Sequence, residues 1–173
     1  MYVNCSSKCT ATSRMYHITR DVLAPHENMY VNCSSKCTAT SRMYHITRDV
    51  LAPEINITFN TYLDECMLKF AAFEFLSNRY QPTVVQFQYT CAQIITKKLF
   101  DLDSLFTKCI SPRLFPILPN VKYVVKGWQP DPDKFPNAYT TGRYKVEAVI
   151  FANSNEELAK LFWYYKLDEV SVF

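Results

Sequence analysis

The chain has 173 residues, of which 49% are hydrophobic and 20% are charged, a composition that indicates one globular domain and excludes a disordered chain. Only two glycines occur, which argues against a glycine-rich phosphate-binding loop. The formal net charge is +3 and the longest run of cations is Lys97-Lys98, so we predict no nucleic-acid partner.

The first 25 residues are repeated without change as residues 29–53, with His26-Glu27-Asn28 between the copies. Two perfect copies without a third do not resemble a solenoid, which stacks several diverging units. A recent duplication or an error in the gene model explains them better. Because the second copy continues directly into the rest of the chain, we assign residues 29–173 to the folded domain. Residues 1–28 are then a surplus, loose copy with its linker.

Seven cysteines are many for a cytosolic chain of this size and favour an oxidising compartment. The disulfide candidates in the domain are Cys33, Cys37, Cys66, Cys91 and Cys109. Because their number is odd, at least one thiol is free or pairs outside the domain. Asn32 and Asn56 begin Asn-x-Ser/Thr tripeptides and are glycosylation candidates. These features predict a secreted protein, although the start of this chain contains no signal peptide and no run of about 18 apolar residues predicts a transmembrane segment.

Alternation of apolar and polar residues predicts β-strands at residues 55–59, 85–89, 144–150 and 161–165. Within residues 68–75 the parity changes between Phe70 and Phe73, which predicts a β-bulge near Ala71-Ala72. Residues 97–106 are better explained as a short helical turn. About seven strands with one polar face each predict an all-β fold, a sandwich of two antiparallel sheets.

Residues able to carry chemistry are present, but their arrangement does not predict catalysis. The carboxylates cluster in segments typical of solvated turns, at Asp101 and Asp103, Asp131 and Asp133, and Glu156 and Glu157. Cys33 and Cys37 have C-x₃-C spacing, but His45 alone does not complete a zinc site. The sequence therefore predicts a binding module without cofactor or metal, and not an enzyme.

Three segments share the pattern of one known family. Residues 82–91, PTVVQFQYTC, are similar to a strand that ends in a cysteine. Lys108-Cys109, with Phe115-Pro116 and the strand pattern that follows, is similar to a disulfide-bearing loop. Residues 135–147, FPNAYTTGRYKVE, are similar to a Pro-x₅-Gly-Arg/Asn-Tyr-Arg/Lys-Val/Ile-Glu signature. With these segments the stretch from Pro82 to Leu167 resembles the ML (myeloid-differentiation-factor-related lipid-recognition) superfamily, above all its secreted arthropod members.

The sequence departs from the family at one point. Many members have a cysteine where Phe115 precedes Pro116. The family's local disulfide at Cys109 is therefore either rewired to Cys91 or absent.

The resemblance implies an immunoglobulin-like sandwich whose sheets hold an acyl chain or a sterol, as a carrier or presenter of lipid. The residues expected to contact the lipid are Phe59, Phe73, Phe75, Phe87, Tyr89, Tyr144, Val146, Ala148, Ile150, Leu161 and Trp163. Aromatic residues at this spacing are by themselves more typical of an ordinary sandwich core. The alternative is a secreted, non-catalytic recognition module with a filled core that acts through a protein receptor.

Overall fold

The computed structural model describes residues 29–48, 50–113, 115–129, 131, 134, 141–153 and 155–167. The prediction of a surplus first copy falls on residues 1–28, which lie outside the described residues. The second copy of the repeat, residues 29–53, supplies strands β1 (Met29–Cys33) and β2 (Cys37–Thr47) and the start of β3 (Val50–Phe59).

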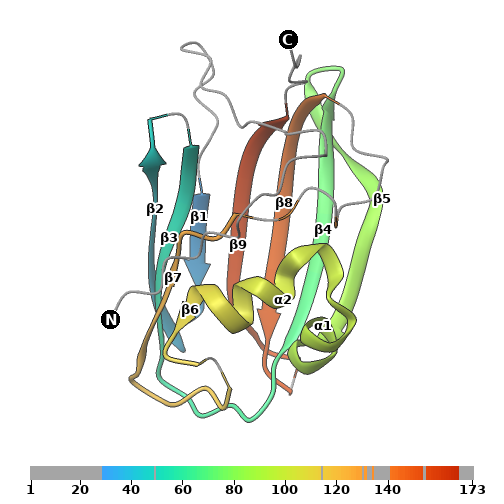
Figure 1. Cartoon of the computed structure of the whole chain (residues 1–173). Helices are drawn as coiled ribbons and strands as arrows, with labels where there is room; N and C mark the ends of the chain where they lie inside the picture. The colour runs from blue at the N-terminus through green and yellow to red at the C-terminus, as the bar shows by residue number, and fades with distance from the viewer. Residues whose placement is uncertain are drawn as a thin grey trace.

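The described residues form two antiparallel sheets that face each other (Figure 1). The five-stranded sheet has the order β1-β9-β8-β4-β5, with β9 at Glu157–Leu167, β8 at Gly142–Phe151, β4 at Met67–Leu76 and β5 at Arg79–Thr90. The four-stranded sheet has the order β2-β3-β7-β6, with β7 at Lys122–Lys126 and β6 at Ile110–Ser111. The predicted all-β sandwich is confirmed.

The β8–β9 hairpin follows the alternation in the sequence. Its apolar residues face the opposite sheet and pair in register: Tyr144 with Tyr165, Val146 with Trp163, and Ala148 with Leu161. Lys145 and Glu147 have the opposite parity and lie on the outer face. Alternation of this kind fixes the register, because a slip by one residue would bury the charged set. The predicted hairpin and its inward parity are confirmed.

The irregularity predicted for β4 lies on its neighbour β5. β4 pairs regularly with β8 from Met67 to Glu74. Its register with β5 shifts between Ala71 and Phe73, whose partners are Gln86 and Pro82, so residues 83–85 of β5 lie opposite Ala72 alone. The Thr83 hydroxyl donates to the carbonyl of Ala72 and accepts from the backbone N–H of Val85. The irregularity predicted near Ala71-Ala72 is present in the ladder, but its extra residues belong to β5. The predicted change of parity in β4 is wrong, and β4 keeps one parity throughout.

A helical segment, residues 91–109, connects β5 to β6 (Figure 1). It begins with α1 (Cys91–Lys97), where Thr90 and Gln93 form a reciprocal capping box that satisfies two backbone N–H groups. A 3₁₀ turn (Leu99–Asp101), α2 (Leu102–Ser104) and a π-helical turn (Leu105–Cys109) follow. The helical turn predicted near residues 97–106 lies inside this longer segment, and the Thr-x-x-Gln pattern was the signal that marks its start.

The core lies between the two sheets and extends under the helical segment. Its largest fully buried side chains include Phe59 and Tyr123 from the four-stranded sheet, Tyr144 from the five-stranded sheet and Ile94 from α1. The Tyr123 hydroxyl accepts from the backbone N–H of Leu118, so this buried phenol is not left without a partner. One continuous hydrophobic cluster therefore holds both sheets and the helical segment together.

Candidate functional site

The inner face of the five-stranded sheet brings together most of the residues predicted to contact a lipid. Those that face the opposite sheet are Phe87, Tyr89, Tyr144, Val146, Ala148, Ile150, Leu161 and Trp163. Phe59 joins the same cluster from β3 of the other sheet. The Lys97 ammonium lies 4.6 Å from the centre of the Tyr89 ring, at the end of this face near α1.

Phe73 and Phe75 do not belong to this interior. They lie on the outer face of β4, where Lys145 is 4.2 Å from the ring centre of Phe73 and Arg143 is 4.0 Å from that of Phe75. The outward positions of Phe73 and Phe75 follow from the regular register of β4, because side chains alternate between the two faces of a strand and Phe70 and Ala72 are on the inner face. The prediction that Phe73 and Phe75 point inward is wrong, because the parity change assigned to β4 does not occur.

Burial is uneven across the inner faces. Phe59, Tyr144, Val146 and Trp163 are at most 7% exposed. A second set packs against the core but keeps part of its apolar surface accessible; these accessible inner residues are Phe87, Tyr89, Ala148, Ile150 and Leu161 of the five-stranded sheet, with Ala39 and Met43 of β2 and Ile110 of β6. They come from both sheets, so apolar surface that faces inward is incompletely covered by the protein itself.

A stack of three phenylalanines joins the helical segment to the sheet. Phe70 and Phe87 stack with ring centres 4.9 Å apart, and Phe100 stacks against both, at 5.9 and 5.4 Å. Phe100 reaches this position with a left-handed backbone (φ 50°), as do its neighbours Lys98 and Asp101. A left-handed conformation is unfavourable for a bulky residue, so the packing of the ring has to compensate for it.

Asp101 is buried at 5% exposure and is the centre of a polar network. Its Oδ2 accepts from the Ser104 hydroxyl (2.8 Å) and from the backbone N–H of Asp131 (3.1 Å), and its Oδ1 accepts from the Lys134 ammonium. Trp128 Nε1–H donates to the Ser104 hydroxyl (3.1 Å). These five residues, the Asp101 network, tie the helical segment to the chain that follows β7.

The prediction that the acidic residues here are solvated is wrong for Asp101. The hydrogen bond to Asp101, with the attraction of the carboxylates of Asp101, Asp103 and Asp131, raises the pKa of Lys134 above its usual value, against the opposing effect of burial. Because both oxygens of Asp101 are occupied by donors, the network is suited to holding structure together.

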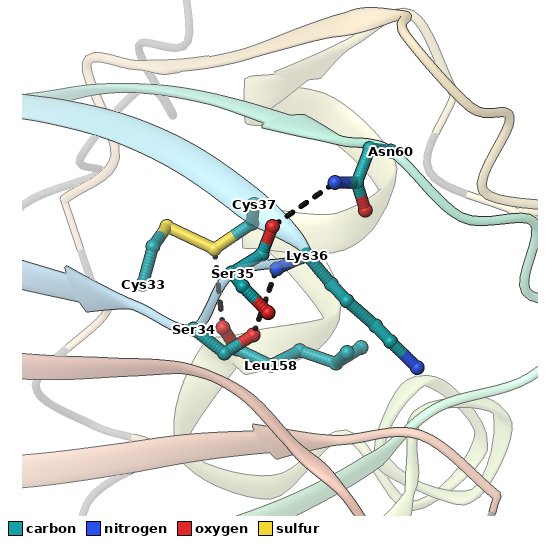
Figure 2. Close-up of a disulfide and its surroundings, with 7 residues drawn as sticks. All are labelled: Cys33, Ser34, Ser35, Lys36, Cys37, Asn60 and Leu158. Carbon is teal, nitrogen blue, oxygen red and sulfur yellow. Dashed lines mark hydrogen bonds between the residues drawn. A yellow bond between two sulfur atoms is a disulfide. The ribbon is translucent and has the colours of Figure 1, made fainter.

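Two disulfides link described cysteines to each other. Cys33–Cys37 closes the turn between β1 and β2, which belong to different sheets, so it joins the sheets at one edge (Figure 2). In the same turn the Cys37 sulfur lies 3.1 Å from the Leu158 carbonyl oxygen, and Asn60 donates to the carbonyl of Ser35.

Cys66–Cys91 ties the start of β4 to the first residue of α1. The alternative pairing of Cys91 with Cys109 is therefore wrong. Cys109 is buried and is not a free thiol.

The two glycosylation candidates differ in their surroundings. Asn32 is exposed on the outer face of the edge strand β1. Asn56 is half-buried in β3, between β2 and β7. An exposed edge position leaves more room for a branched sugar than the middle of a sheet, so Asn32 is the better acceptor in the folded domain.

Within the described part of the chain, no three His, Cys, Asp or Glu side chains lie close enough together to hold a metal ion. His45 is exposed on β2. Among the same residues, no helix is both long and apolar enough to cross a membrane. Comparison of the chain with models of known families and with curated proteins finds no match.

Proposed function

We propose that this protein is a secreted lipid-binding protein that holds an acyl chain or a sterol between its two sheets, as a carrier or presenter. The observation that carries the proposal is the set of accessible inner residues. Apolar side chains such as Ala148, Leu161 and Met43 face the opposite sheet and yet keep surface that the protein does not cover. Residues with this property are contributed by both sheets, which is the arrangement that a ligand lying between the sheets requires.

The chemistry of these residues selects the class of ligand. Side chains without charge or strong hydrogen-bonding groups bind by removing apolar surface from water, at about 0.8 kcal/mol for each methylene group buried. An acyl chain or a sterol offers many such groups and few polar atoms. Sites for ligands of this kind are apolar, with a small number of polar groups that fix orientation. The phenol of Tyr89, at the end of the inner face near α1, is a candidate for such a polar contact.

Secretion is part of the proposal. It is supported by the Cys33–Cys37 and Cys66–Cys91 disulfides, because such bonds persist in oxidising compartments. The exposed sequon at Asn32 agrees with it. Expression through a secretory pathway, followed by a mass shift on enzymatic removal of N-linked glycans, would test this part separately.

Two alanines on the inner face give a matched test of lipid binding. Ala148 is an accessible inner residue, whereas Ala72 on the adjacent strand is fully buried. Ala72→Trp should destabilise the protein by about 1–3 kcal/mol or more, because a packed core does not accept the added bulk. Ala148→Trp should lower the stability by less and should displace a bound fatty acid. We would measure urea unfolding, and binding of a fluorescent fatty acid, for both variants and the parent.

The outcomes separate lipid binding from a recognition module with a filled core. Loss of fatty-acid binding in Ala148→Trp, with stability close to that of the parent, would support the carrier. Equal destabilisation by the two substitutions, together with no binding by the parent, would contradict it and favour the recognition module. Lipids extracted from the protein as secreted by its native source, identified by mass spectrometry, would name the ligand.

A further inference from the structure

The outer face of the five-stranded sheet carries an unusual number of aromatic side chains. In an antiparallel sheet with one face on the core, the other face is normally polar. Here Tyr30 of β1 is 52% exposed, and further aromatic residues lie beside it across the sheet. We call this surface the outer aromatic face; its members are Tyr30, Phe73, Phe75, Tyr80, Phe162 and Tyr164.

Four of these rings contact one another in series, from β1 through β9 and β5 to β4. The ring centres of Tyr30 and Tyr164 are 6.3 Å apart, those of Tyr164 and Tyr80 5.6 Å, and those of Tyr80 and Phe75 5.0 Å. Successive rings are tilted by 79°, 68° and 63°. Burial, followed by the neighbouring Tyr164, raises the pKa of Tyr80. Because the rings meet edge to face, they do not offer the flat platform on which a sugar ring stacks.

Cations accompany the aromatic rings on the same face. Besides Arg143 over Phe75 and Lys145 over Phe73, Lys160 lies 5.2 Å from the ring centre of Phe162. Glu147 is shared by two of these cations, at 2.6 Å from Lys145 and 3.6 Å from Lys160.

Two further cations lie on this face. Arg143 and Lys69 are exposed, and within the described residues no carboxylate pairs with either of them. Among the described residues, the cations of the outer aromatic face therefore outnumber its carboxylates.

We propose that the outer aromatic face docks on a membrane surface that contains anionic lipids. Tyrosine side chains have an apolar ring and a polar tip, which suits the boundary between lipid tails and headgroups. Cations beside them are attracted to anionic headgroups, and the complementary charge favours such a bilayer over a neutral one. This docking goes beyond the binding of lipid between the sheets and does not depend on it, although a carrier gains from a surface that brings it to a membrane.

Asn32 lies on the same face of β1 as Tyr30, and a glycan there would cover the face, so the proposed docking is that of the chain without this glycan. The test therefore uses the full, non-glycosylated chain and vesicles of two compositions, phosphatidylcholine alone and phosphatidylcholine with 30% phosphatidylglycerol. Lys69→Gln/Arg143→Gln removes two exposed cations from the face. Lys108→Gln/Lys122→Gln removes two exposed cations elsewhere and leaves the same net charge. Tyr30→Ser is matched by Tyr62→Ser, because Tyr62 is 57% exposed and lies in the connection between β3 and β4, outside the five-stranded sheet. Co-sedimentation measures binding, and urea unfolding checks that each variant is folded.

We expect the parent to bind the anionic vesicles and not the neutral ones, and to be released as salt is raised. Since each cation near the surface contributes about 1 kcal/mol and 1.4 kcal/mol is tenfold, the Lys69/Arg143 variant should bind about 30-fold more weakly. Tyr30→Ser should also weaken binding, and both controls should bind within about threefold of the parent.

Three results would overturn the proposal: no binding to anionic vesicles, equal binding to neutral vesicles, or losses in the controls as large as those in the face variants. Retention on immobilised heparin without vesicle binding would assign the face to an acidic polysaccharide and would also overturn it. Fatty-acid binding by the same variants is measured in parallel. A failure of docking is thereby distinguished from a failure of the proposed carrier function.

Discussion

Asp101 and Lys134 form the ion pair that holds the helical segment to the chain after β7. The two residues lie far apart in the sequence, and no local pattern links them. Asp101 adopts a left-handed backbone (φ 59°), which aspartate tolerates better than most residues. Its side chain is 7% exposed, and that of Lys134 is 37% exposed. One partner of the ion pair is thus buried and the other is partly exposed to water. Its net contribution to the free energy of unfolding at neutral pH is about 1 kcal/mol, which is the upper end of the range for exposed ion pairs.

The raised pKa of Lys134 predicts how this contact depends on pH. A lysine whose pKa is higher in the folded than in the unfolded state stabilises the protein fully below its unfolded pKa of about 10.4. That contribution is lost as the pH rises through the folded pKa. The parent should therefore lose more stability between about pH 10 and 12 than Lys134→Gln does. Urea unfolding of both proteins across this range measures the difference, in which the titration of the tyrosines cancels. Parallel curves for the two proteins would contradict the prediction.

At the scale of elements, the two disulfides should contribute unequally. Cys66–Cys91 spans 25 residues and Cys33–Cys37 spans 4. In the chain-entropy model the longer loop restricts the unfolded state more, which gives about 3.5 kcal/mol for the first bond and about 2 kcal/mol for the second. We expect Cys66→Ala/Cys91→Ala to be less stable than Cys33→Ala/Cys37→Ala in urea under non-reducing conditions. The reverse order would show that the link between β1 and β2 at the sheet edge matters more than loop length.

The strands show how far the sequence predicts the fold. The sequence predicts the parity of β8 and β9 correctly, because charged residues such as Lys145 and Lys166 mark one face and apolar residues mark the other. It predicts the wrong face for Phe73 and Phe75, because an aromatic outer face has the composition of an inner one. The burial of Asp101 depends on Lys134, 33 residues away in the chain, and no local pattern encodes that contact. The pairing of the cysteines likewise depends on which segments of the chain the fold brings together.

At the scale of the whole molecule, the repeat raises the question of which residues the fold needs. The second copy of the repeat supplies β1, β2 and the start of β3, and each of these strands pairs within one of the two sheets. A chain that begins at Met29 should therefore unfold cooperatively, with far-ultraviolet circular dichroism like that of the full chain. Thermal unfolding of both forms, with fatty-acid binding as a second measurement, tests this. A truncated chain without a cooperative transition would show that residues 1–28 are required for the fold.

The irregular register of β5 affects whether two molecules of this protein can pair through the edges of their sheets. β5 is an edge strand, and an edge strand with a regular backbone is a template on which another chain can add itself. Residues 83–85 interrupt that template, because the Thr83 hydroxyl occupies the backbone N–H of Val85 and the side chain of Val84 projects into water at 90% exposure. A strand from a second molecule would therefore find the row of backbone hydrogen-bonding groups interrupted, beside the protruding side chain of Val84. The irregular stretch of β5 therefore makes this edge of the sheet a poor template for pairing with a strand of a second molecule.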